Sequence, residues 1–310
     1  LLIFGVIILR LAYIQLIDPK YEKLARGNAL RHVVQYPPRG EIFDRNGEYL
    51  AQNRVCYDLM VIYRELPREG FDTLQMLDLL GISRTKLERA LRNARMSPRI
   101  PYMVTNFISS EVKLRFDEND FPGFYTVYRT IRSYPRKIGG NLLGDVGEIN
   151  ERQLKMKRYA DYRSGDYVGQ SGVEKAYEEE LRGKKGVKIM EKDTHGVVKG
   201  SYMDGMFDSL PEPGNYIVTT IDARLQAFTE ELMRGKVGAA VAIEPSTGEI
   251  LMMVSSPTFD PDEMVGRHRG NNYMKMLYNK RQPMFNRAVK AKYPPGSTFK
   301  LVQGLIGLQE

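Results

Sequence analysis

The sequence has little of what metal sites, disulfide frameworks and phosphate-binding loops are built from. Its 310 residues include a single cysteine, Cys56, so no intrachain disulfide can form. The three histidines, His32, His195 and His268, are too far apart for metal-ligand spacing. Residues 183–186, Gly-Lys-Lys-Gly, lack the spacing and the Ser/Thr of a phosphate-binding loop. We therefore expect no metal and no cofactor.

The charge also lacks a pattern that would point to nucleic acid. The net charge is +8, but residues 1–210 carry 34 Lys and Arg against 28 Asp and Glu, and residues 211–310 carry 12 against 10. This excess is spread along the chain, without a basic run that could follow a phosphate backbone. We expect no nucleic-acid partner and only a mild attraction to anionic surfaces or polymers.

The amino end is the strongest compositional feature. Residues 1–17 are apolar except for Arg10 and Gln15, slightly fewer than the 20 or so that a membrane-spanning helix needs. Asp18-Pro19-Lys20 follows in place of a small-residue cleavage site, which favours an uncleaved signal anchor over a buried core helix. Because the first residue is Leu and not Met, we expect that the start of the gene product is missing. No second span follows, so we expect the rest of the chain to lie outside the cytoplasm.

Two helices are predicted before the middle of the chain, at residues 72–80 and 84–95, with Gly81 between them. They resemble a helix-turn-helix, but the expected anchor places them outside the cytoplasm. We therefore interpret the second helix as presenting a solvated basic face. Its basic residues are Arg84, Lys86, Arg89, Arg92 and Arg95.

A turn is predicted at residues 44–47 and a charged helix at 174–181.

Pro211, Pro213 and Gly214 mark a boundary, after which the pattern changes. A helix is predicted at residues 223–233, and an apolar strand at 237–243 is followed by a tight turn and a returning strand at 249–255. Such a hairpin needs one face covered to be stable. Residues 299–308 have apolar side chains at helical spacing, so we expect them to form the helix that covers it.

The segment with clear chemical potential is Tyr-Pro-Pro-Gly-Ser-Thr-Phe-Lys at residues 293–300. The two prolines prevent a helix from extending backward, so Ser297 is expected at or near the first position of the helix that follows. Residues three apart share a helix face, which places the Lys300 amine beside the Ser297 hydroxyl. A serine needs a base to become a nucleophile, and a lysine can serve if its pKa falls from about 10.4 toward neutrality. The helix N-terminus would also stabilise an oxyanion.

A Ser-x-x-Lys spacing alone is weak evidence, because a helix-capping serine and a solvated lysine produce it equally well. Its context strengthens it, since several motifs in this order resemble class B penicillin-binding proteins. These motifs are Pro38-Arg39-Gly40-Glu41-Ile42-Phe43-Asp44-Arg45-Asn46-Gly47, Leu143-Gly144-Asp145-Val146-Gly147, Gly169-Gln170-Ser171-Gly172-Val173-Glu174, Thr220-Ile221-Asp222 and residues 240–251. Within that class the chain is most similar to the elongation-type group, penicillin-binding protein 2, although division-type relatives share much of the pattern.

The resemblance implies an α+β protein in three parts: a transmembrane signal anchor at residues 1–17, an elongated multi-subdomain pedestal at 18–210, and the start of a transpeptidase domain at 211–310 with a serine β-lactamase-like fold. It implies a peptidoglycan D,D-transpeptidase that also binds β-lactams, with Ser297 as nucleophile and Lys300 as general base. The implied partners are stem peptides ending in D-Ala-D-Ala, the cytoplasmic membrane and a multi-span glycan polymerase.

The family carries two further motifs downstream, Ser-x-Asn and Lys-Thr/Ser-Gly, and the sequence ends at Glu310 before either. We expect that the 310 residues alone neither crosslink nor label efficiently with penicillin, and that the sequence is truncated at both ends. Two alternatives stay open. One is a β-lactamase or a β-lactam sensor, and the other is a non-catalytic scaffold that activates a glycan polymerase.

Overall fold

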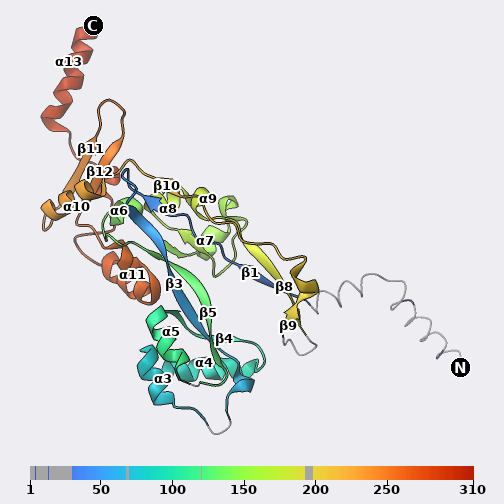
Figure 1. The fold of residues 1–310 in the computed structure, drawn as a ribbon. Coiled ribbons are helices and arrows are strands. Elements are labelled where there is room, and N and C mark those ends of the chain that lie inside the picture. The colour runs from blue at the N-terminus through green and yellow to red at the C-terminus, as the bar shows by residue number, and fades with distance from the viewer. Residues whose placement is uncertain (1–3, 5–12, 14–29, 68–69, 120, 193–197) are drawn as a thin grey trace.

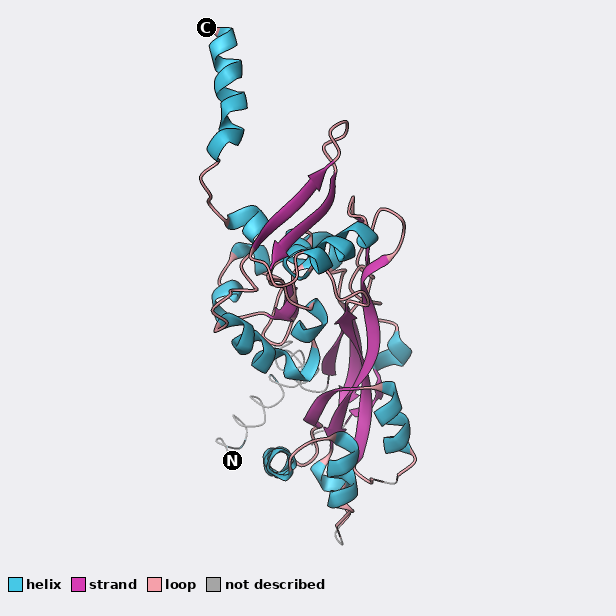
Figure 2. Cartoon of the chain, turned by 90° about the vertical axis from the view of Figure 1, so that its left-hand side faces the viewer, coloured by secondary structure: helices cyan, strands magenta, loops and turns pink. Residues whose placement is uncertain are grey.

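The computed structural model describes residues 4, 13, 30–67, 70–119, 121–192 and 198–310. Its helices and strands are mixed without the regular alternation of a parallel α/β fold, so the predicted α+β class is confirmed. The molecule is elongated, with a lobe of small helices at one end and helix α13 (Lys300–Gln309) at the other (Figures 1 and 2).

The expected membrane anchor at residues 1–17 lies outside the described residues, apart from Phe4 and Tyr13, and so does most of the polar segment that follows it. Within the described ranges, none of the helices combines the length and the apolar character needed to cross a bilayer.

The centre of the molecule is a five-stranded sheet in which β3 is the longest strand. The order is β10-β2-β3-β4, and β5 is a further strand that pairs with β3 outside this order. β10 runs parallel to β2, and the other pairings are antiparallel. The predicted turn at residues 44–47 joins β2 to β3, with Gly47 at a φ of 81°. The strands are β2 (Ile42–Phe43), β3 (Tyr49–Val61), β4 (Tyr102–Ile108), β5 (Phe124–Ser133) and β10 (Ile217–Val218).

The described part of residues 62–121, which we call the helical lobe, packs on one end of this sheet. The two helices predicted there are confirmed as α3 (Thr73–Leu80) and α4 (Arg84–Met96), and α5 (Ser110–Asp117) and the 3₁₀ turn η1 (Tyr63–Glu65) complete the lobe. The side chains of Asp72, Ser83 and Ser109 cap the three helices. The lobe core contains Leu59, Val61, Met76, Leu87, Ile108 and Phe116.

Short elements surround the other end of β3, and the chain also forms a second small sheet to one side of it. That sheet has the antiparallel order β1-β8-β9. The predicted charged helix at 174–181 is divided at Tyr177, where the backbone leaves the helical region at φ −106° and ψ 32°. The elements are β1 (Leu30–Gln35), β6 (Val146–Glu148), β7 (Tyr167–Gly169), β8 (Gly186–Lys192), β9 (Val198–Ser201), α6 (Gly140–Leu143), α7 (Glu151–Leu154), α8 (Gly172–Ala176), α9 (Glu178–Leu181), η2 (Lys157–Tyr159) and η3 (Tyr202–Gly205).

The carboxyl-terminal part contains the predicted hairpin, now β11 (Gly238–Ile243) and β12 (Ile250–Ser256), and the predicted helix before it, α10 (Ala223–Leu232). α10 packs on β12, where the buried Gln226 side chain exchanges two hydrogen bonds of 2.9 Å with the Met253 backbone. The remaining elements are η4 (Pro261–Met264), η5 (Gly266–His268), α11 (Arg269–Leu277), α12 (Arg287–Lys290) and η6 (Gly296–Phe299).

The prediction that the helix at 299–308 covers this hairpin is wrong. α13 contains no buried residue, and both figures show it standing away from β11 and β12. The place beside the hairpin is taken by α12, which contacts both strands and is held by the Ser255 hydroxyl, hydrogen-bonded to the backbone N–H of Arg287 at 2.9 Å. Residues 291–295, which belong to no helix or strand, then carry the chain away from the hairpin, and Pro294 and Pro295 prevent α12 and α13 from merging.

Candidate functional site

The segment with the Ser-x-x-Lys spacing is helical, as predicted. Ser297 is the second residue of η6, and Lys300 begins α13 directly after it, so the two lie one helical turn apart on a continuous segment. Both side chains are exposed. Among the described residues, neither the hydroxyl nor the amine has a hydrogen-bond or ion-pair partner, and no apolar wall encloses them.

Arg39 and Glu174, which belong to separate sequence motifs, meet in a cluster around one buried carboxylate. Glu174, with no exposed side-chain surface, accepts hydrogen bonds from Arg39 at 2.7 Å and from Arg132 at 2.6 Å. Arg39 also binds Glu178 at 2.7 Å, and Arg132 donates to the carbonyl of Gly40 at 2.8 Å. We call this group of five residues the Glu174 cluster. It joins the segment before β2 to strand β5 and to helices α8 and α9.

The electrostatics of the Glu174 cluster favour its ionised form. Burial alone would raise the pKa of Glu174, but the two guanidinium groups of Arg132 and Arg39 outweigh it and hold that pKa below its ordinary value. Burial likewise works against the charge of Arg39, and its two carboxylate partners raise its pKa nonetheless. The cluster is therefore a fully charged, hydrogen-bonded group inside the protein, which makes each partner costly to remove.

Gly40 illustrates how closely the backbones approach around this cluster. A Cβ atom added at Gly40 would lie 1.9 Å from the carbonyl oxygen of Asn215. We expect Gly40→Ala to lower the free energy of unfolding by about 3 kcal/mol, because the obstacle is backbone and cannot rotate away. Gly270→Ala in α11 is the matched control: nothing lies within 4 Å of its added Cβ, so stability should rise slightly. Chemical denaturation of both variants measures the difference, and equal stabilities would contradict the prediction.

Asp44 lies in the same motif as Arg39 and Gly40, residues 38–47, and connects this motif to the carboxyl-terminal part of the chain. Its fully buried carboxylate accepts hydrogen bonds from the backbone N–H groups of Asn46 and Glu48, each at 2.8 Å, and from that of Ala223 at 3.1 Å. Ala223 begins α10, so one carboxylate closes the β2–β3 turn and also holds the first turn of a helix nearly 180 residues away. Burial acts to raise the pKa of Asp44, but these hydrogen bonds bring it below its ordinary value.

We expect Asp44→Asn to destabilise the protein by about 2 kcal/mol at pH 7, because an amide cannot accept from all of these donors. A carboxylate with a depressed folded-state pKa contributes stability above its unfolded pKa of about 4, and loses that contribution as the pH falls through the folded-state value. The difference between wild type and variant should therefore shrink below about pH 4. Urea denaturation across pH, with the exposed Asp78→Asn as control, measures it; a gap independent of pH would contradict the assignment.

Residues after 260 are also tied to the rest of the molecule by arginines. Arg267 donates to the backbone carbonyl of Leu80 at 3.0 Å and to that of Asn106 at 3.3 Å, which links η5 to the helical lobe. Arg269, in the first turn of α11, pairs with Asp145 at 2.6 Å. The sequence did not suggest these contacts, because isolated arginines carry no spacing signal.

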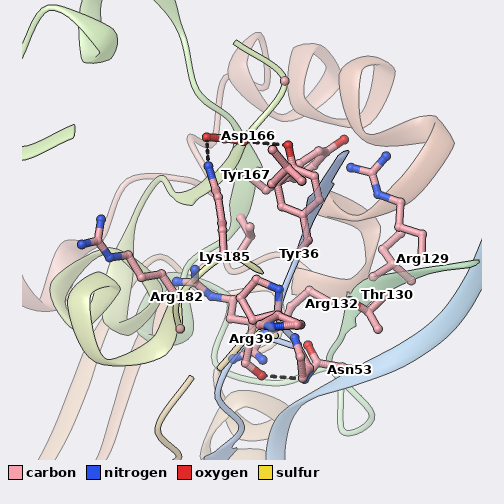
Figure 3. Close-up of a pocket in the computed structure, with 18 of the residues that line it drawn as sticks. Tyr36, Arg39, Asn53, Arg129, Thr130, Arg132, Asp166, Tyr167, Arg182 and Lys185 are labelled. Atoms are coloured by element: carbon pink, nitrogen blue, oxygen red, sulfur yellow. Dashed lines mark hydrogen bonds and ion pairs between the residues drawn. The ribbon is translucent and has the colours of Figure 1, made fainter. Parts of the chain in front are cut away.

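A cavity of about 1200 Å³ lies beside β5, lined by the chain before Arg39 and by residues around β7 (Figure 3). Its basic side chains resemble those of an anion-binding site, but their charges are neutralised by paired carboxylates. Arg129 pairs with Asp58 at 3.1 Å and lies over the rings of Phe107 and Tyr167, and Lys185 pairs with Asp166. Arg39 and Arg132 belong to the Glu174 cluster. The cavity therefore offers aromatic and paired polar surface rather than free positive charge.

Comparison with known proteins agrees with this arrangement. The model of the penicillin-binding protein dimerisation domain matches residues 34–219, and that of the penicillin-binding protein transpeptidase domain matches residues 238–310. The first match alone covers more than half of the sequence, so the chain belongs to the penicillin-binding protein family. The predicted resemblance to this family is confirmed.

Among similar proteins is the peptidoglycan D,D-transpeptidase MrdA of Acinetobacter baumannii, 32% identical over 306 residues, which cover 96% of this chain and 45% of that protein. MrdA of Escherichia coli K12 is 31% identical over 317 residues, covering 97% and 48%. The solved penicillin-binding protein PBP2 of Helicobacter pylori in complex with MreC has a TM-score of 0.67 at 25% identity, covering 91% of this chain and 53% of that one. The chain thus spans about half the length of the curated relatives that it matches.

Proposed function

We propose that this chain is part of an elongation-type peptidoglycan D,D-transpeptidase in which Ser297 is the nucleophile. The observation that supports this most directly is the position of Ser297, in the first helical turn after two prolines and inside the segment matched by the transpeptidase model. The similarity to MrdA proteins supports the same reaction. It does not favour a β-lactamase or a purely non-catalytic scaffold.

In this reaction the Ser297 oxygen attacks the carbonyl of the penultimate D-Ala of a stem peptide. Lys300, one turn away, takes the serine proton. The terminal D-Ala leaves with a proton on its amine, and the amine of a second stem peptide resolves the ester and restores the serine. A β-lactam undergoes the same attack, but its leaving nitrogen stays attached to the ring-opened acyl group. Lys300 can act as a base only in a drier setting than the exposed one described here, which remaining parts of a complete transpeptidase domain would supply.

The proposed organisation places an anchor at residues 1–17 in the cytoplasmic membrane, a pedestal at 18–210, and the start of the catalytic domain at 211–310, with the bulk of the chain outside the cytoplasm. The apolar character of residues 1–17 supports the anchor. An MreC-type protein is a proposed pedestal partner, because the similar Helicobacter pylori protein was solved with MreC. A multi-span glycan polymerase is a further proposed partner.

The test uses a full-length protein that contains this chain. Incubation with penicillin, followed by proteolysis and mass spectrometry, should find the penicilloyl adduct on the peptide that carries Ser297. An adduct on another serine would contradict the proposed nucleophile, and the absence of any adduct would contradict the proposed transpeptidase.

A further inference from the structure

The helical lobe separates its charges in a way that its fold does not require. Residues 84–100 contain six basic residues and one acidic residue, whereas the rest of residues 62–121 contains four basic and eight acidic ones. The lobe as a whole is therefore nearly neutral, and its positive charge is concentrated on α4 and the turn that follows. Charges that served only solubility would be mixed over the surface.

Three arginines of α4 are directed away from the core and are left without counter-charges. Leu87, Ala90 and Ala94 form the buried face, while Arg89, Arg92 and Arg95 are exposed. The single acid of the helix, Glu88, is already paired with Arg84 at 2.9 Å. Among the described residues, no carboxylate lies within ion-pair distance of these three arginines or of Arg99. This basic surface is available to a partner from outside the lobe.

Apolar side chains and a pocket adjoin the arginines. Met96 is 84% exposed and Ile100 is 46% exposed, although both are large and apolar. Arg64 and Arg99 line a pocket of about 420 Å³ together with Ser97, Pro98 and Ile100. A pocket lined by two arginines and a serine offers residue types that suit the oxygens of a phosphate group. We call Arg64, Arg89, Arg92, Arg95, Met96, Arg99 and Ile100 together the docking surface.

We propose that the docking surface binds the anionic lipid headgroups of the membrane in which the protein is anchored. This inference rests on the anchor in the proposed function. Arginines on a helix face attract an anionic bilayer, and exposed apolar side chains beside them can enter its interfacial region. Met96 and Ile100 have no such role against a soluble anionic polymer, which would be bound by charge alone. The mixture of Arg and apolar residues therefore favours a lipid surface.

The arrangement of the molecule agrees with a helical lobe whose docking surface contacts the membrane. The helical lobe lies at the end of the molecule opposite α13. The chain enters the fold from residue 30 through the sheet β1-β8-β9, and this sheet also lies away from α13, toward the half of the molecule that contains the lobe (Figure 1). Because the proposed anchor would tether the lobe to one bilayer, the local lipid concentration would be high, and a weak contact would be enough to populate the docked state. Docking would fix the tilt of the elongated molecule over the membrane.

The experiment uses the full-length anchored protein in lipid nanodiscs, with Met96→Cys carrying a polarity-sensitive dye. Within the 310 residues Cys56 is the one native cysteine and is 4% exposed, and any cysteine elsewhere in the full-length protein is replaced by serine, so that the label attaches at position 96. In discs of phosphatidylcholine and phosphatidylglycerol in equal parts, we expect the dye to be shielded from acrylamide and quenched by lipids spin-labelled near the headgroup. Neither effect is expected in pure phosphatidylcholine. Arg92→Gln/Arg95→Gln/Arg99→Gln should lower the ratio of docked to undocked protein by about a hundredfold, taking about a fivefold effect for each arginine.

The matched control is Lys280→Gln/Lys290→Gln/Lys292→Gln, which removes the same charge from exposed positions outside the lobe and should leave the dye shielded. A dye equally open to acrylamide in both lipids shows a solvated face and overturns the proposal. So does shielding that is equal in neutral lipid, or shielding that appears only after a soluble polyanion or a protein partner is added. Extraction of the protein from the discs by alkaline carbonate would instead refute the proposed anchor.

Discussion

Ser297→Ala in the full-length protein is expected to abolish covalent labelling by fluorescent penicillin, with a loss of at least about 10³-fold in the acylation rate. In the proposed reaction the serine oxygen is the atom that forms the bond, so no neighbouring group can replace it. Lys300→Ala should leave the nucleophile present but unassisted, and slow acylation by about 10²- to 10⁴-fold. Stopped-flow or gel-based labelling over a range of penicillin concentrations measures both rates.

Thr298→Ala provides the control, because it removes a hydroxyl from the same helical turn. Its own contact is with the Pro295 carbonyl at 2.5 Å, within one turn of backbone, so labelling should persist. If Ser297→Ala still labelled at the wild-type rate, or if Thr298→Ala lost labelling while Ser297→Ala kept it, the nucleophile would be misassigned. Circular dichroism of each variant establishes that the fold is retained.

Glu174→Ala is expected to produce the largest loss of stability, about 3–5 kcal/mol. The substitution removes the shared partner of Arg39 and Arg132 and leaves two guanidinium groups without their main counter-charge inside the protein. Glu178 would still neutralise Arg39 in part, but Arg132 would keep only the Gly40 carbonyl. Equilibrium denaturation monitored by tyrosine fluorescence measures the change.

Glu179→Ala is the matched control, since this exposed glutamate lies five residues along the same segment. It should change the free energy of unfolding by less than about 0.5 kcal/mol. The free energy of unfolding of Glu174→Gln should fall between those of Glu174→Ala and Glu179→Ala, because glutamine keeps the volume and one acceptor oxygen but loses the charge. Equal stabilities of Glu174→Ala and Glu179→Ala would show that the buried cluster contributes nothing to stability.

Much of the local structure could be predicted because it depends on neighbouring residues. The periodicity of apolar residues and the break at Gly81 located α3 and α4 to within a residue or two. The apolar run before the tight turn at 245–248 and the returning strand after it located the hairpin. The helix at 174–181 was predicted as one piece, and its division at Tyr177 depends on tertiary contacts that bring Glu174 and Glu178 inward to Arg39.

The relations between distant segments could not be predicted from patterns alone. A glutamate in a charged helix is normally solvated, so nothing in its neighbours reveals that Glu174 meets Arg39 across 135 residues. The placement of α13 failed for a related reason, since apolar spacing shows that a helix has a face to bury but does not specify the surface that receives it. The roles of Ser297 and Lys300 remain predictions, because the chemistry depends on an enclosure that their exposed side chains do not have.

Strand β3 has a mechanical consequence for a protein built in this way. Its thirteen residues span roughly 43 Å in extended form. Leu59 and Val61 belong to the core of the helical lobe, whereas Leu50 and Ala51 belong to the core that also contains Ile221 and Ala223 at the start of α10. Because one continuous strand contributes to both cores, we expect a force that tilts the helical lobe to be transmitted along β3 to the start of α10.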